Sequence, residues 1–151
     1  MITGWQTKAT EDKNAVETFW ASHPDANIGV VTGGKLGLFV LDVDGDMGRQ
    51  SLADLRQQHG RLPRTVKVLT PRGSHYYFRT DEPLRNSVKK LGAGLDVRSE
   101  GGYVVGAGSV NGEGVRYRYA KGLSPDDVGM AEIPDWLLAL LRSYGQKLVT
   151  A

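Results

Sequence analysis

Hydrophobic and polar residues alternate along several short segments of the chain, which is the pattern of β-strands that bury one face. The strongest strand signal is of another kind: the continuous apolar run 36–41 predicts a buried strand, and it continues directly into Asp42-Val43-Asp44. Further short strands are predicted at 27–31, 65–69, 75–78, 94–98, 103–105 and 115–119. Because short turn segments separate consecutive strands, three hairpins are predicted: 27–31 with 36–41, 65–69 with 75–78, and 94–98 with 103–105.

Three other segments are predicted to form helices, each with one buried side. The first is predicted over 10–21, with Thr10 as its N-cap and Trp20 in the core, and the second over 51–58. The third is predicted over 134–148, with a buried side of Trp136, Leu137, Leu140, Leu141 and Tyr144. Hairpins with interspersed helices predict an α+β fold, in which helices cover one face of an antiparallel sheet and the other face stays open.

Three of the predicted strands place charged or polar side chains on one face. Successive strand side chains point to opposite faces, so Asp42 and Asp44 share a face, and Asp96 shares one with Arg98. His75 lies in the third strand, opposite in phase to its apolar neighbours. Taken alone, an Asp-x-Asp motif is more often a solvated strand end than a metal site. Taken alone, a histidine in an aromatic strand is more often a half-buried packing residue than a ligand. The coincidence of all three strands favours one site on a shared sheet surface.

The chemistry of this candidate site points to a divalent cation. Carboxylates that share a face repel each other, and a divalent cation removes that penalty. Hard oxygen ligands suit Mg²⁺ or Mn²⁺. The chain contains no cysteine, which excludes disulfides and every cysteine-ligated zinc or iron–sulfur site.

Composition narrows the class of protein only a little. A chain of 151 residues suits a single domain over 1–151, and 40% hydrophobic residues is ordinary for a globular protein. No apolar run reaches the roughly 20 residues that span a bilayer, and no secretory leader is recognised. The absence of cysteine fits a cytoplasmic location. A net charge of +2 neither requires nor excludes nucleic acid.

Residues beside the candidate site offer further contacts. Gly73 and Ser74 could let the backbone approach a phosphate, or they could form an ordinary hairpin turn, and both readings stay open. Arg72, Lys89 and Lys90 are weaker candidates for contacts with nucleotide or DNA phosphates, since a plain solvated role is commoner for such residues.

The chain also carries an ordered set of motifs that resembles a known family. These motifs are Gly4-Trp5, Ala9-Thr10, Asn27-Ile28-Gly29-Val30, Thr32-Gly33, Leu41-Asp42-Val43-Asp44, Gly73-Ser74-His75-Tyr76-Tyr77-Phe78, Asp96-Val97-Arg98 and Gly101-Gly102-Tyr103-Val104-Val105. The set resembles the bifunctional DNA primase/polymerase (prim-pol) domain of plasmid and phage replication proteins, within the archaeo-eukaryotic primase superfamily. The resemblance runs from about Gly4 to Pro134-Asp135-Trp136-Leu137, which is nearly the whole chain.

The resemblance implies an RRM-like catalytic core that builds DNA or RNA strands from nucleoside triphosphates on a DNA template and primer. By position, Asp42, Asp44 and Asp96 would hold two Mg²⁺ or Mn²⁺ ions, and His75 and Arg98 would contact the triphosphate. Several relatives carry a zinc-binding element, but no zinc is expected here because cysteine is absent. A helicase domain or partner commonly accompanies such domains, so the chain is also compatible with a piece of a larger replication protein.

Two other classes of function remain as alternatives. Three carboxylates with a histidine also suit a metal-dependent nuclease or phosphoesterase. A non-catalytic replication-initiation or single-strand DNA-binding module is less favoured, because such a surface needs cations and stacking rings where this one has carboxylates. Tyr77 and Tyr103 are the only rings expected near the site.

Overall fold

The main sheet is built around one long apolar strand, β2 (Leu38–Asp44), in a computed structural model that describes residues 3–144. Strand β2 is antiparallel to β4 (Gly73–Arg79) on one side and to β6 (Leu95–Arg98) on the other. The strand order is β5-β6-β2-β4-β3-β8, with β9 (Ala131–Glu132) parallel to β4. The outer strands are β5 (Ser87–Val88), β3 (Lys67–Leu69) and β8 (Arg118–Tyr119).

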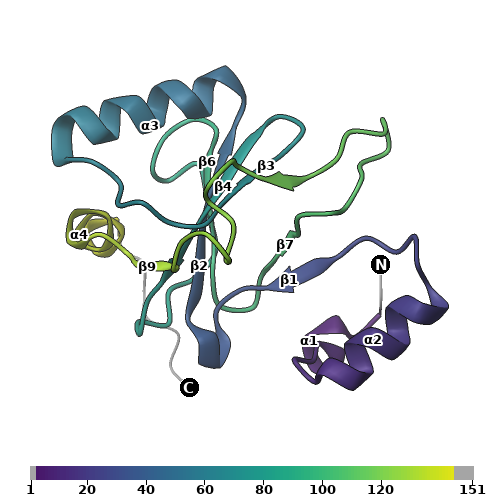
Figure 1. Ribbon diagram of the computed structural model, residues 1–151. Helices are drawn as coiled ribbons and strands as arrows, with labels where there is room; N and C mark the ends of the chain where they lie inside the picture. The colour runs from purple at the N-terminus through teal and green to yellow at the C-terminus, as the bar shows by residue number, and fades with distance from the viewer. Residues whose placement is uncertain (1–2, 145–151) are drawn as a thin grey trace.

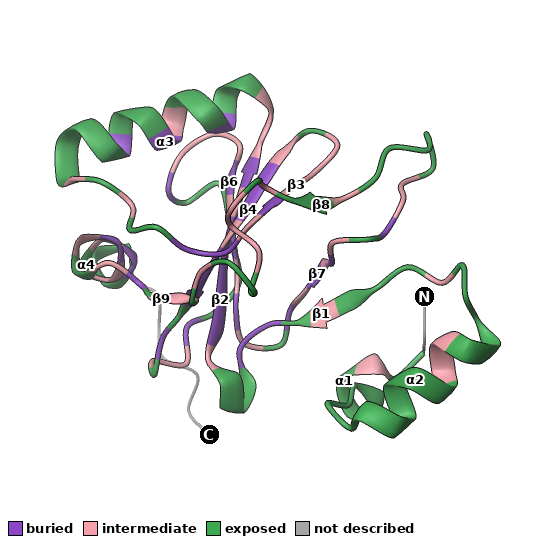
Figure 2. Ribbon diagram, in the orientation of Figure 1, coloured by how far each residue is buried: buried purple, intermediate pink, exposed green. Residues whose placement is uncertain are grey.

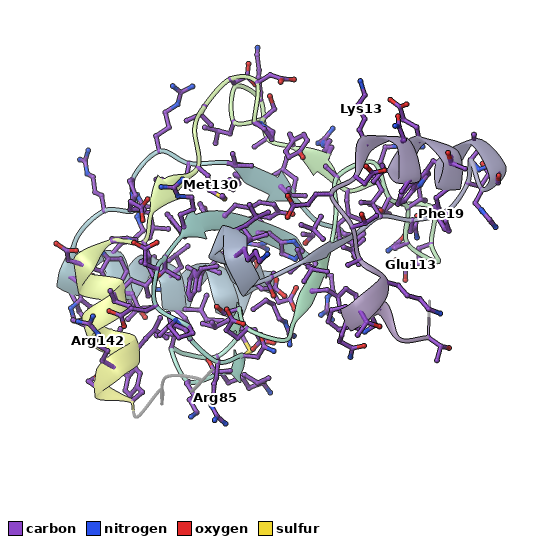
Figure 3. The ribbon with its side chains drawn as sticks, turned by 90° about the horizontal axis from the view of Figure 1, so that it is seen from below. Lys13, Phe19, Arg85, Glu113, Met130 and Arg142 are labelled. Carbon is purple, nitrogen blue, oxygen red and sulfur yellow. The ribbon has the colours of Figure 1, made fainter. Side chains whose placement is uncertain are left out.

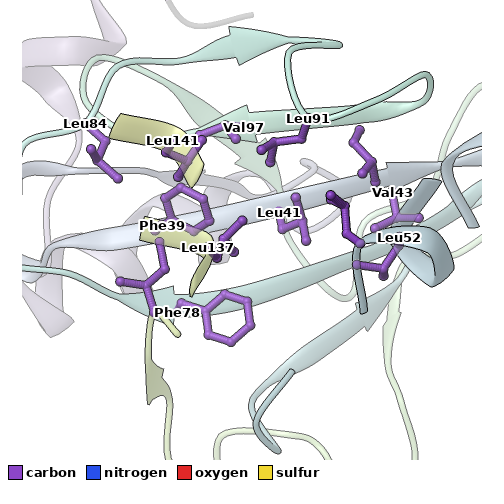
Figure 4. Packing of buried hydrophobic residues seen from close by; sticks show 13 residues of the cluster. Phe39, Leu41, Val43, Leu52, Phe78, Leu84, Leu91, Val97, Leu137 and Leu141 are labelled. Carbon is purple, nitrogen blue, oxygen red and sulfur yellow. The ribbon is translucent and has the colours of Figure 1, made fainter. Parts of the chain in front are cut away.

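Helices α3 (Gly45–His59) and α4 (Asp135–Ser143) cover one face of this sheet, as Figures 1 and 4 show. Phe39, Leu41 and Val43 point from β2 into that layer, and all three are buried. Phe39 and Leu41 lie toward the fully buried Leu137 and Leu141 of α4, whereas Val43 lies beside Leu52 of α3, as Figure 4 shows. Because apolar side chains on β2 alternate, Leu38 and Val40 point to the opposite face and join a second, smaller cluster.

The N-terminal part of the chain lies beside the main sheet. Strand β1 (Gly29–Val31) pairs with β7 (Tyr103–Val105) in a separate two-stranded sheet. Helices α1 (Trp5–Lys8) and α2 (Lys13–Ser22) lie near that sheet, on the right in Figure 1. Neither helix has a buried residue, as their exposed colouring in Figure 2 shows.

The α+β class and the helices on one face are confirmed. The RRM-like topology that the resemblance implies stays a prediction. Within residues 3–144, no helix is long and apolar enough to cross a membrane.

Of the three predicted hairpins, only that of β3 with β4 is confirmed. The other two are wrong, because β1 and β7 pair with each other and not with β2 and β6. Between β1 and β2 the chain forms a short 3-10 helix, η1 (Gly34–Leu36), flanked by Gly33 and Gly37 at positive φ. This turn redirects β1 away from β2 and leaves one isolated bridge, between Gly33 and Leu38. The predicted strand 115–119 is also shorter, since only Arg118–Tyr119 is a strand.

The predicted helix bounds need corrections at their ends. Helix α2 starts later than predicted, because the Asp12 carboxylate, and not Thr10, accepts a hydrogen bond from the Ala15 N–H at 2.7 Å. Trp20 is only partly buried, so its predicted place in the core is wrong; its indole N–H donates to the Ala26 carbonyl. Helix α3 begins at Gly45, six residues before the predicted start at 51.

The C-terminal helix α4 is confirmed over Asp135–Ser143, and positions 145–148 of its predicted range lie outside the described residues. Leu137 and Leu141 form its buried side, while Trp136 and Leu140 are partly buried. Tyr144 was predicted to be buried, but it is exposed because it lies past the last helical turn.

Candidate active site

Strand register brings three of the predicted site residues into one row. Asp42 of β2 lies directly opposite His75 of β4 and directly opposite Asp96 of β6. Directly opposed residues have Cβ atoms about 4.5–5.5 Å apart and side chains on the same face. Asp44 lies two residues along β2 on the same face, and Arg98 lies opposite Val40 on that face. The predicted convergence of these side chains on one sheet surface is therefore observed.

Each carboxylate of the group has a nitrogen donor beside it. The His75 Nε2 atom lies 3.4 Å from Asp42 Oδ1. An Arg72 guanidinium nitrogen lies 2.9 Å from Asp44 Oδ2. Asp96 accepts a hydrogen bond from the Lys89 backbone N–H at 3.0 Å and has Arg98 at 3.3 Å. Nitrogen donors thus lie beside all three acids, and the Arg72 and Arg98 guanidinium groups offset part of the repulsion between the carboxylates.

His75 is the most enclosed member of the group, with only 7% of its surface exposed. Its Nδ1 atom is buried and has no hydrogen-bond partner among the described residues. The ring of Tyr117 lies 6.4 Å away, centroid to centroid. Buried polar atoms are nearly always paired, so an unpaired imidazole nitrogen beside a cleft is the kind of group that a ligand satisfies.

The group borders a cleft of about 870 Å³. Asp42, Asp44, His75 and Arg98 line this cleft, and so does Arg72. Small-molecule sites have volumes of about 300–1,000 Å³, so the cleft has the size of a ligand site. Asp96 does not line it, because its carboxylate is turned toward Lys89 and Arg98.

The carboxylates of the group share one face, but they are not gathered around a single point as the ligands of one metal ion would be. Among residues 3–144, no three histidine or carboxylate side chains are gathered as ligands of one ion. Each acid is instead turned to its own nitrogen partner, as described above. The chemistry of the donor set nevertheless fits Mg²⁺ or Mn²⁺, because three carboxylates from neighbouring strands share one face and two of them line the cleft.

Gly73 and Ser74 do not line the cleft. A Cβ atom on Gly73 would lie 1.8 Å from the Val43 carbonyl oxygen, so the glycine is required by the close approach of β4 to β2. Ser74 lies opposite Val43, whose side chain joins the helix-covered cluster, and Ser74 therefore points away from the carboxylates. The hairpin-turn reading is the one that the structure supports for this pair.

Lys89 and Lys90 are exposed and lie outside the lining of the cleft. Lys89 adopts a positive φ of 57°, in the segment whose N–H groups contact Asp96 and β6. The two lysines therefore flank the acidic row at the β5–β6 side of the sheet, where they stay candidates for phosphate contacts.

Sequence reasoning missed two rings of the cleft, Trp5 and Tyr117. Trp5 contacts Tyr103, whose ring centroid is 5.1 Å away. Tyr103 lines the cleft as expected, whereas Tyr77 is part of the second core cluster. Burial, followed by the nearby Tyr119, raises the pKa of the Tyr77 phenol above its ordinary value. For Tyr117 the only signal was its alternation with Arg116 and Arg118, and for Trp5 it was the Gly4-Trp5 motif.

Comparison with known proteins agrees with the motif-based resemblance. The family model described as "Bifunctional DNA primase/polymerase, N-terminal" matches residues 1–136 of the chain. No curated protein matches the chain at a significant level. The match covers the cleft residues from Trp5 to Tyr117 and all three aspartates of the acidic group.

Proposed function

Since the chain belongs to the bifunctional DNA primase/polymerase family, we propose that it transfers nucleotides from nucleoside triphosphates to a strand growing on a DNA template. The setting that we propose is plasmid, phage or prophage replication, with a helicase domain or partner acting alongside. The observation that carries the proposal is the row of Asp42, His75 and Asp96, which lies beside a cleft of nucleotide size.

In this reaction the 3′ oxygen of the primer forms a bond to the α-phosphorus of the triphosphate, and pyrophosphate leaves. We propose that Asp42, Asp44 and Asp96 hold two Mg²⁺ or Mn²⁺ ions, because they are the carboxylates of one sheet face. When bound, such ions activate the attacking oxygen and stabilise the leaving group. Asp96 would exchange its contacts with Lys89 and Arg98 for the cation, since its backbone is already placed opposite Asp42.

His75, Arg98 and Arg72 are the proposed contacts for the triphosphate. The two guanidinium groups now lie against Asp96 and Asp44, and they become available when those carboxylates bind cations. Arginine matches phosphate oxygens with paired N–H donors. The unpaired Nδ1 of His75 gives the imidazole one free polar atom for a phosphate oxygen or its bound water.

The test is primer extension on a short primed DNA template with Mg²⁺ or Mn²⁺, with deoxynucleotides and ribonucleotides supplied separately. The proposal expects extension by the wild type and at least a 100-fold loss in Asp42→Asn and Asp44→Asn, because removal of a carboxylate ligand disrupts the two-metal arrangement. Asp46→Asn is the matched control, because Asp46 is an exposed neighbouring acid that pairs with Arg49 and does not line the cleft.

Three results separate the possible functions. Unchanged extension by Asp42→Asn would contradict the assignment of the site. Cleavage of the DNA with no triphosphate binding would favour the nuclease alternative. An unprimed template in the same assay shows whether the chain also begins strands.

A further inference from the structure

The cleft has an aromatic wall that the proposed chemistry does not use. It consists of Trp5 of α1 and Tyr103 of β7, whose rings meet edge to face at 5.1 Å with an interplanar angle of 62°. Both side chains are partly exposed, and α1 buries none of its residues. A large indole is therefore held at the surface of a cleft by contact with a second ring, where it is available to a ligand.

The backbone fixes this wall relative to the proposed triphosphate contacts. Only the connection 99–102 separates Arg98 at the end of β6 from Tyr103 at the start of β7. Thr32 holds that connection at both ends, because its hydroxyl donates to the Ser99 carbonyl at 2.6 Å and its N–H donates to the Gly102 carbonyl at 3.0 Å. The Ser99 N–H in turn donates to the Asn86 side chain at 2.7 Å.

Between Arg98 and the aromatic wall, the surface of the cleft includes two glycines, which we call its floor. Gly101 and Gly102 both line the cleft. At Gly102 a Cβ atom would lie 2.6 Å from the Asn86 side-chain oxygen and 2.8 Å from the Thr32 hydroxyl oxygen, so a side chain there would displace the two groups that hold this connection. A ligand that binds Arg98 through its phosphates can thus extend along this floor to the rings.

We infer that Trp5 and Tyr103 form a platform on which the base of the incoming nucleotide stacks. This inference rests on the proposed function, because it takes the triphosphate to lie at His75 and Arg98. Stacking on aromatic rings tolerates every base, since each base has a π-face. The platform would therefore bind nucleotides without selecting among bases, which is what a template-directed enzyme requires of its own residues.

The experiment compares a purine nucleoside triphosphate, dATP, with inorganic tripolyphosphate, which has no base, in calorimetric titrations with Mn²⁺. Trp5→Ala is expected to weaken dATP binding by about fivefold to 140-fold, which corresponds to about 1–3 kcal/mol for one stacked base. Its affinity for tripolyphosphate is expected to stay unchanged, and Trp5→Phe is expected to retain most of the dATP affinity.

Trp20→Ala is the matched control. Trp20 is also partly exposed and makes an edge-to-face contact, with Phe19 at 4.7 Å, but it lies on α2 and does not line the cleft. Figure 3 marks the position of that helix through the labelled Lys13 and Phe19. Trp20→Ala is expected to bind dATP as the wild type does. An equal loss in both variants would overturn the inference.

A second measurement leaves Trp5 in place, in case its removal disturbs folding. The chain has three tryptophans, so Trp20→Phe combined with Trp136→Phe leaves Trp5 as the only one. Its fluorescence is expected to change with dATP and not with tripolyphosphate. A signal that does not respond to dATP overturns the platform. If the wild-type protein binds tripolyphosphate as tightly as dATP, the platform is overturned but the proposed function stands. If the wild-type protein binds neither compound, the proposed function itself is overturned.

Discussion

At the scale of single residues, the stability of the acidic group depends on the partner that each carboxylate contacts. Only 15% of the Asp42 side chain and 8% of the His75 side chain are exposed. A carboxylate with little access to water needs a partner, because an unpaired buried charge is costly. Asp42 and His75 meet that need for each other in the structure as described, at 3.4 Å. The pair is thus both a structural contact and a candidate contact for a bound nucleotide.

His75→Ala is expected to weaken binding of a nucleoside triphosphate by about tenfold to 140-fold, because a hydrogen bond to a charged group contributes about 1.5–3 kcal/mol. Calorimetric titration with dATP measures this. His75→Gln retains a side-chain hydrogen-bond donor and is expected to lose less.

His59→Ala serves as the control for that substitution. His59 stacks on Trp136 with ring centroids 5.6 Å apart, at the end of α3 and outside the cleft lining. Its removal is expected to leave dATP affinity unchanged. If His75→Ala also binds dATP with wild-type affinity, the proposed role of His75 in the triphosphate site is wrong.

At the scale of elements, the strands that carry the site could be predicted because their local pattern encodes them. Strand β2 is an apolar run that ends in Asp42-Val43-Asp44, and β4 and β6 alternate apolar side chains with polar or charged ones. These patterns predicted the three strands and the face that Asp42, His75 and Asp96 share. The β3–β4 hairpin followed in the same way from its short turn.

The pairing of β1 with β7 could not be predicted from local pattern. Residues Gly29 and Val105 are partners although the whole of 32–102 separates their strands in the sequence. Both strands lie next to other predicted strands in sequence, so short-range reasoning favoured two false hairpins. The position of Trp5 at the cleft depends on the same long-range pairing, since its contact Tyr103 lies on β7. This is why the aromatic part of the site was missed while the acidic part was found.

Gly73→Ala tests the close approach of β4 to β2. The added methyl group would overlap the Val43 carbonyl, which is rigid backbone, so the strands must move apart. Overpacking of this kind costs about 1–3 kcal/mol. At roughly 2–4 °C per kcal/mol, the thermal unfolding midpoint is expected to fall by up to about 12 °C.

Gly129→Ala is the matched control for thermal unfolding. A Cβ atom at Gly129 would have no atom within 4 Å, and this glycine is not at positive φ. Its midpoint is expected to stay near that of the wild type. A Gly73→Ala protein as stable as Gly129→Ala would show that β4 and β2 are not as close as the structure places them.

At the scale of the whole molecule, the two faces of the sheet differ in what they carry. Helices α3 and α4 bury one face, and the opposite face carries the acidic group and the cleft beside the second, smaller core cluster. The net charge is only +2, so long-range attraction of DNA is weak and depends on where the cations lie. Lys89 and Lys90 lie on the segment beside Asp96, which places positive charge next to the acidic group.

Binding of single-stranded DNA is therefore expected to be weak and to fall steeply as salt increases. Each phosphate contact contributes a slope of about −0.7 to the plot of log affinity against log salt concentration. If both lysines contact phosphates, Lys89→Ala combined with Lys90→Ala reduces the magnitude of the slope by about 1.4. Fluorescence anisotropy of a labelled single strand, titrated at several salt concentrations, measures the slope directly.

Lys35→Ala combined with Lys121→Ala removes the same amount of charge from two other exposed lysines that do not line the cleft. If the slope depends on local contacts, this control keeps the wild-type slope while the Lys89 and Lys90 variant loses part of it. An equal change in both variants would mean that DNA responds only to net charge. A wild-type affinity that does not change with salt would contradict phosphate contacts altogether, because release of condensed counterions accompanies every such contact.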